Sequence, residues 1–125
     1  MESLYINETQ STPKVILDKM NQQFEISGNS LPEDVMGFYT PILNWMEKYI
    51  ENPNPQTIFV FKLYYFNSAS SKVILDILTA IEQLIKDGHD AKIDWYYLEV
   101  DEDMLSTGNE YAELLKIPFN FIPYT

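Results

Sequence analysis

The longest run of β-forming residues lies between Ile58 and Phe66, where almost every position is apolar or aromatic. Such a run is typical of a strand that is covered on both faces, as in a parallel or mixed sheet with helices around it. From Lys72 to Ile85 the apolar residues take the spacing of one helical face. The pattern therefore predicts a strand that passes into a helix through the small and polar segment 67–71.

Shorter β segments come before this unit. Alternation of apolar and polar residues predicts a first strand at Leu4–Ile6 and a hairpin of Val15–Leu17 with Phe24–Ile26. Residues 19–22 supply the hairpin turn, and Gly28 with Asn29 is expected to end the hairpin.

The first helix is expected to follow Ser30. Ser30 and Glu33 have the spacing of a capping box, so Ser30 is the expected N-cap. Apolar residues then recur on one helical face from Val35 to Ile50. The sequence Asn-Pro-Asn-Pro at 52–55 ends this helix.

Pro41 interrupts that helical pattern. Inside a helix it removes the hydrogen bond to the Gly37 carbonyl, at a cost of about 3 kcal/mol. Because the apolar face keeps its phase across the break, we expect one helix with a kink. The alternative is a new helix that begins with Thr40 as N-cap and Pro41 as its first residue.

The second half of the chain repeats the alternation of helix and strand. Gly88 is expected to end the second helix in a left-handed conformation, and Lys92–Val100 reads as the next strand. Segment 101–107 is compatible with either a helix entry or a loop, because Gly108 and Asn109 weaken the helical pattern. A last helical face around Tyr111–Leu115 precedes a short strand at Phe119–Ile122.

This order of elements indicates an α/β fold. We expect a single-layer mixed β-sheet flanked by about three helices, with right-handed crossovers from Thr57 onward. The length of 125 residues suits one domain with a substantial core.

The charge of the chain restricts its partners. There are 19 acidic residues against 8 lysines and no arginine, which gives a net charge of −11. Such a field disfavours nucleic acid and anionic membranes as partners. It suits a basic patch on a protein partner, or simply solubility. Cysteine is absent, and neither a signal peptide nor a membrane-length apolar run is visible, so a cytoplasmic soluble protein is expected.

The residues that carry chemistry in other proteins form no catalytic pattern here. The four glycines build no phosphate-binding loop, and His89 is expected to be an exposed turn residue. The acids Glu99 and Asp101–Asp103 lack the glycine of a calcium loop, so a solvated turn is favoured over a cation site. The sequence therefore predicts no catalytic residue, metal or cofactor.

Three serines occupy the predicted strand-to-helix junction. Free backbone N–H groups and the positive end of the helix dipole gather there, so a phosphate on Ser68, Ser70 or Ser71 would be well placed. Lys72 is the nearest basic residue and is able to hold such a phosphate. From chemistry alone, ordinary helix capping by one of these serines is favoured over a regulatory role.

The segment Tyr64–Lys72, followed by Asp76–Leu78, resembles the central motif of the SiaC-type regulatory phosphoproteins. These small bacterial proteins are similar to the STAS domains of anti-sigma-factor antagonists. Their motif is a strand ending in Leu-Asn, then Thr or Ser, then small polar residues and a helix. The resemblance spans essentially the whole chain and implies a single STAS-like regulatory domain over residues 1–125. Agreement extends to Thr9, Gln10, Ser11, Thr12, Pro13, Pro32, Glu33, Trp45, Ile117, Pro118 and Phe119.

The resemblance implies a signalling protein that is not an enzyme. Its unphosphorylated form would bind and activate a diguanylate cyclase in cyclic-di-GMP signalling, and phosphorylation would release it. A dedicated protein kinase and a PP2C-type phosphatase would act on Ser68, which replaces the threonine of the best-known members. The choice among the three serines stays open. Alternatives are an unswitched scaffold of the same fold and a small enzyme that uses the acids at 99–103. The supporting switch loop would comprise Asn67, Ala69, Ser70, Ser71 and Lys72.

Overall fold

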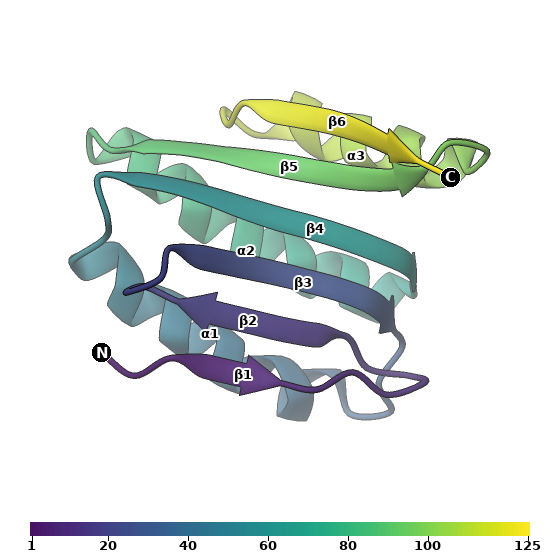
Figure 1. Cartoon of the computed structure of the whole chain (residues 1–125), viewed down its shortest axis with the longest axis horizontal. Coiled ribbons are helices and arrows are strands. Elements are labelled where there is room, and N and C mark those ends of the chain that lie inside the picture. The colour runs from purple at the N-terminus through teal and green to yellow at the C-terminus, as the bar shows by residue number, and fades with distance from the viewer.

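The computed structural model describes all residues from 1 to 125. It contains one six-stranded sheet in the order β1-β2-β3-β4-β5-β6, with three helices behind it (Figure 1). The predicted order of strands and helices and the mixed sheet are confirmed. The elements are β1 (Leu4–Ile6), β2 (Lys14–Asp18), β3 (Gln23–Ser30), α1 (Val35–Glu51), β4 (Gln56–Phe66), α2 (Ser68–Lys86), β5 (Asp90–Leu98), α3 (Glu102–Leu114) and β6 (Phe119–Tyr124).

The connections between strands place all three helices on one face of the sheet. Strands β1 to β3 pair antiparallel, whereas β3 to β6 pair parallel. Each parallel crossover leads to the next strand in the same direction and is right-handed, as expected (Figure 1). Right-handed crossovers that all advance in the same direction across the sheet must place their helices on the same face of the sheet.

The other face of the sheet therefore lacks a helical layer, and the prediction that β4 is covered on both faces is wrong. Phe59, Phe61 and Leu63 are buried beneath the helices, while Ile58 and Val60 on the opposite face are only partly buried. The apolar run in β4 therefore has one face that the helices bury and one face that is only partly buried.

The core lies between the sheet and the helices, and Trp95 of β5 is at one end of it. Its side chain is 1% exposed, and its Nε1 donates to the Met104 carbonyl in α3 at 3.1 Å. A Cβ at position 108 would lie 2.6 Å from that same nitrogen. Gly108 thus lets α3 approach Trp95, and α3 is continuous from Glu102, with Asp101 as N-cap. The loop alternative for segment 101–107 is wrong for this reason.

The region around Ser30 also differs from expectation. Strand β3 does not end at Gly28 but continues to Ser30, because Gly28 adopts a φ of +110° and the pairing register shifts after it. Ser30 is therefore the last residue of a strand and caps no helix. The N-cap of α1 is Asp34, whose Oδ1 accepts a hydrogen bond from the Gly37 N–H at 3.0 Å.

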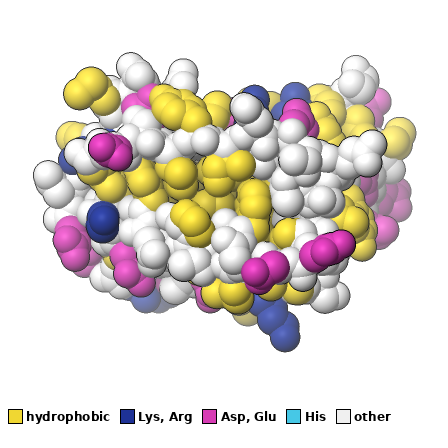
Figure 2. Space-filling model, turned by 90° about the horizontal axis from the view of Figure 1, so that it is seen from below, with side chains coloured by type: hydrophobic (Ala, Val, Ile, Leu, Met, Phe, Trp, Pro, Cys, Tyr) yellow, Lys and Arg dark blue, Asp and Glu magenta, His cyan; other side chains and the backbone are white.

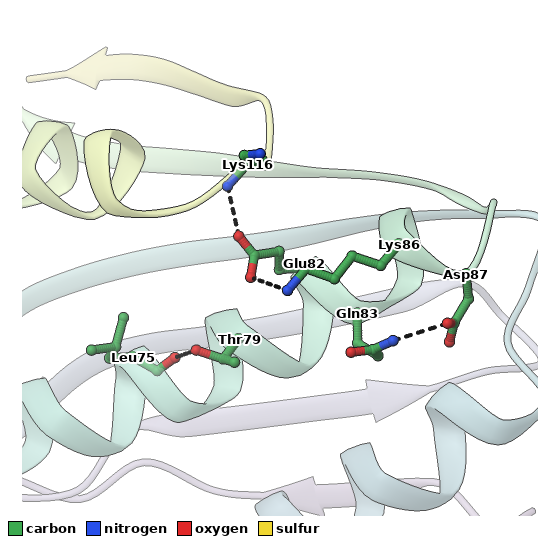
Figure 3. A network of polar contacts seen from close by, with 7 residues as sticks. All are labelled: Leu75, Thr79, Glu82, Gln83, Lys86, Asp87 and Lys116. Carbon is green, nitrogen blue, oxygen red and sulfur yellow. Dashed lines mark hydrogen bonds and ion pairs between the residues drawn. The ribbon is translucent and has the colours of Figure 1, made fainter.

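Helix α1 runs without interruption through Pro41, which confirms one helix rather than two. The predicted left-handed end of α2 is also confirmed, since Gly88 has a φ of +93°. Farther along α2, Glu82 accepts a hydrogen bond from the Lys116 N–H at 2.8 Å and pairs with Lys86 at 3.3 Å (Figure 3). The hydrogen bond from Lys116 fastens α2 to the connection between α3 and β6, whereas the ion pair lies within α2. None of the helices has the length and apolar character needed to cross a membrane.

The start of the chain, just before the edge strand β1, is held against α1. Trp45 Nε1 donates to the Glu2 carbonyl at 2.8 Å, and hydrophobic side chains gather in the middle of this edge (Figure 2). On the other side of β1, Tyr5 donates its hydroxyl proton to the Asp18 carboxylate. That hydrogen bond, together with those from Asn21, lowers the pKa of Asp18 to about 2.

Candidate functional site

The serine-rich segment forms the first turn of α2, directly after the central strand β4. Asn67 is the N-cap, and its side-chain oxygen accepts a hydrogen bond from the Ser70 N–H at 2.9 Å. The helix begins at Ser68 and not near Lys72 as the apolar spacing suggested, because Asn67 caps it. The three serines are residues of the helix, and none of them is its cap.

Ser70 is fully buried at the junction of three elements. Its hydroxyl donates to the Ser30 carbonyl at 3.0 Å and accepts from the Ser30 hydroxyl at 2.9 Å. The Ser30 hydroxyl is also 2.5 Å from the hydroxyl of Tyr39 in α1, whose pKa is raised by burial. This network fastens the start of α2 to β3 and α1, and it leaves no room for a phosphate on Ser70.

Ser71 is tied to the opposite side of the junction. Its hydroxyl is 3.0 Å from the Tyr111 hydroxyl, which in turn donates to the Ser71 carbonyl at 2.8 Å. Tyr111 belongs to α3 and is 5% exposed, and burial raises its pKa. The two tyrosines thus brace the first turn of α2 from both neighbouring helices.

Ser68 differs from both of these serines. It is exposed, and its hydroxyl makes no hydrogen bond within the chain. Its neighbour Ala69 is exposed too, as is Lys72 one turn later, which forms no ion pair. Ser68 is therefore the one serine of this turn whose hydroxyl a kinase could reach without disturbing buried hydrogen bonds.

The polar segment near the start of the chain lies next to this junction. Thr9 Oγ1 accepts hydrogen bonds from the backbone N–H groups of Ser11 and Thr12, at 3.2 and 3.0 Å. The Ser11 carbonyl accepts from the Leu31 N–H at 2.8 Å, so this loop is fastened at the end of β3. The Asn67 N–H donates to the Ser30 carbonyl at 3.1 Å. The two sequence motifs thus meet at the end of β3, on either side of Ser30. The predicted loop residues Gln10 and Pro13 belong to the same connection, where the Gln10 carbonyl accepts from Asn29 at 3.5 Å.

Sequence reasoning missed the residues that brace the first turn of α2. Ser30 was assigned to a helix cap, and Tyr39 and Tyr111 read only as members of apolar helical faces. No local pattern marks them, because their partners lie between 9 and 40 positions away in the chain.

The other candidates from the sequence are not brought into a catalytic arrangement. His89 is partly buried in the turn before β5. Of the acids at 99–103, Asp101 and Asp103 line a shallow hollow of about 280 Å³ with Tyr64 and Tyr65. Nowhere do three histidine, cysteine or acidic side chains converge in a manner suited to a metal ion.

Comparison with known proteins places this geometry in context. A model of the SiaC family regulatory phosphoprotein matches residues 6–124. An uncharacterised protein of Pseudomonas aeruginosa strain UCBPP-PA14 is 27% identical over 119 residues, which cover 95% of this chain and 94% of that protein.

Solved structures agree with that match. Apo-SiaC from Pseudomonas aeruginosa is 25% identical, with a TM-score of 0.88 over 98% of this chain and 99% of the other. A chain in the crystal structure of the diguanylate cyclase SiaD in complex with its activator SiaC, from the same organism, is 26% identical. Its TM-score is 0.91 over 97% of this chain and 99% of the other. The fold is thus shared along the whole chain.

Proposed function

The chain belongs to the SiaC family of regulatory phosphoproteins, and from this we propose that it is a non-enzymatic signalling protein controlled by phosphorylation of Ser68. With Ser68 unmodified, it binds and activates a diguanylate cyclase. A protein kinase adds phosphate to Ser68 and so releases the cyclase, and a PP2C-type phosphatase removes the phosphate. The protein acts in the bacterial cytoplasm, where the kinase finds ATP.

The observation that carries this proposal is the contrast among the three serines. Ser70 and Ser71 use their hydroxyls to hold α2 against its neighbours, whereas Ser68 is exposed and free of hydrogen bonds. A modification that must be added and removed repeatedly without unfolding the domain needs such a position. The complex of SiaD with SiaC, a protein of the same fold, supports a cyclase as the partner.

The effect of the phosphate is local. It adds about −1.5 to −2 charges at neutral pH, a small change on a chain that already carries −11. At the first position of α2 the helix dipole favours the new charge by up to about 2 kcal/mol, so the fold tolerates it. A partner that covers Ser68 would instead have to bury a dianion that the single charge of Lys72 balances only in part, which costs several kcal/mol. About 2.8 kcal/mol is already a hundredfold in affinity.

Phosphoserine incorporated at position 68 during synthesis tests the switch without needing the kinase. The unmodified chain and Ser68→Ala should both bind the cognate cyclase and raise its output of cyclic di-GMP. The phosphoserine chain should bind at least a hundredfold more weakly. Phosphoserine at the exposed position 79, eleven residues beyond Ser68 in α2, serves as the control for added charge.

Equal affinity of the unmodified and the phosphoserine-68 chains would point to an unswitched interaction domain of the same fold. For the kinase step, incubation with the cognate kinase and ATP should add one phosphate by mass spectrometry, and Ser68→Ala should abolish it. Phosphate found on another residue would contradict the assignment of Ser68.

A further inference from the structure

A hollow lies at the carboxyl end of the parallel strand β4, and its lining residue Phe66 stands two positions before Ser68. It has a volume of about 280 Å³ and lies between the end of β4 and the start of α3. The lining includes Tyr64, Tyr65 and Phe66, which directly precede the switch segment. This volume is below the range of about 300–1,000 Å³ that holds whole small molecules. The hollow therefore suits a side chain of another protein better than a free metabolite.

Two exposed tyrosines give this hollow an affinity for cations. Tyr64 is 49% exposed and Tyr65 is 56% exposed, and the faces of aromatic rings attract ammonium and guanidinium groups. The same chain shows this chemistry nearby, because the Lys62 ammonium lies 4.6 Å from the centre of the Tyr124 ring and 5.7 Å from that of Tyr96. No cation of the chain lies over Tyr64 or Tyr65.

Two carboxylates complete the lining. Asp101 uses Oδ1 to accept from the Met104 N–H at 3.0 Å, and neither Asp101 nor Asp103 forms an ion pair with a lysine of the chain. This hollow thus has negative charge that no lysine of the chain balances.

We propose that this tyrosine–aspartate hollow binds a lysine or arginine side chain of the partner protein. The aliphatic stem packs on Phe66 and Met104, and the charged group lies between the tyrosine rings and the two carboxylates. The inference rests on the proposed function, since it assigns this edge to partner binding. It is compatible with release by phosphate, because two carboxylates already neutralise the cation bound from the partner and leave only Lys72 to balance a phosphate on Ser68.

Nuclear magnetic resonance titration of the unmodified chain tests the hollow directly. The probe is a short peptide of alternating leucine and arginine, compared with the same peptide in which citrulline replaces arginine. The arginine peptide should shift the resonances of Tyr64, Tyr65 and segment 101–104, and the citrulline peptide should bind at least about fivefold more weakly.

Variants locate the binding. Asp101→Asn with Asp103→Asn should weaken the arginine peptide about fivefold or more, and the helix cap survives because asparagine caps as well as aspartate. Asp90→Asn removes an exposed acid at the start of β5, at the opposite end of the parallel strands, and should leave the affinity unchanged.

Equal binding of both peptides, or an equal loss in the Asp90→Asn chain, would overturn the proposal. This assay uses neither phosphate nor cyclase, so its failure leaves the Ser68 switch standing. Conversely, failure of the phosphoserine experiment does not alter the peptide result.

Discussion

Aspartate at position 70 and aspartate at position 68, both in the first turn of α2, should have opposite effects on the stability of the fold. Ser70 is 0% exposed, and its hydroxyl both donates to and accepts from Ser30. Ser70→Asp puts a carboxylate into this buried junction, where the Ser30 carbonyl and hydroxyl and the Tyr39 hydroxyl offer no positive charge. Ser68→Asp instead places the carboxylate in solvent at the first position of a helix.

The magnitudes separate the two variants clearly. Burial of an unpaired charge costs several kcal/mol, and the hydrogen bonds of the Ser70 hydroxyl add about 1 kcal/mol each. We expect Ser70→Asp to lose about 4 kcal/mol or more, a large part of the roughly 5–15 kcal/mol that stabilises a domain. Ser68→Asp should gain about 0.3–1 kcal/mol from the helix dipole.

Urea unfolding measures these differences through the fluorescence of the two tryptophans, Trp45 and Trp95, both of which are buried. Ser106→Asp, an exposed position within α3, is the control for added charge. A Ser70→Asp chain within 1 kcal/mol of the parent would refute the buried network. A Ser68→Asp chain that loses more than 1 kcal/mol would show that position 68 does not tolerate a negative charge, against the proposed switch.

Two further predictions concern the framework around the site. Gly108→Ala should lower the free energy of unfolding by about 1–3 kcal/mol, because the added methyl group overpacks against Trp95. This loss outweighs the advantage of about 1 kcal/mol that alanine has over glycine in a helix. A variant that is more stable in urea unfolding would contradict the close contact. The pKa of Asp18 falls from its ordinary value of 3.8 to about 2 through its hydrogen bond from Tyr5. Its stabilising contribution is therefore complete only above about pH 5 and is lost as the pH falls towards 2. Asp18→Asn should make the melting temperature less dependent on pH between about pH 5 and about pH 2. If the melting temperatures of both chains fell equally over this range, the lowered pKa of Asp18 would be contradicted.

The sequence was a good guide to which strands and helices form and in what order, whereas several of their end points were predicted wrongly. Alternating and helical spacings placed every strand and helix in order, and the conformational freedom of Gly88 marked the end of α2. The prediction that helices cover both faces of β4 was wrong, because apolar composition does not reveal on which face of the sheet the crossovers place their helices. The role of Ser30 was missed because its partner Ser70 lies 40 residues farther along the chain.

The same distinction explains the candidate site. The resemblance pointed to Ser68, but local chemistry gave no reason to prefer it over Ser70 or Ser71, since all three have the same hydroxyl and lie in one helical turn. Only the packing of α1 and α3 on this turn separates them, through Tyr39 and Tyr111. Burial and hydrogen bonding, rather than residue type, therefore decide which hydroxyl remains accessible.

This bracing also bears on how a phosphate at Ser68 would act. The backbone of the turn is held from both sides, by Ser70 through Ser30 and by Ser71 through Tyr111. A new charge at the exposed position meets a turn that cannot rearrange without breaking buried hydrogen bonds, each of which is worth about 1 kcal/mol. The cost of the phosphate must then appear mainly in the partner complex, as a dianion buried at the interface. A switch of this kind works by charge at a fixed surface, and we expect the phosphorylated and unmodified chains to share one backbone structure.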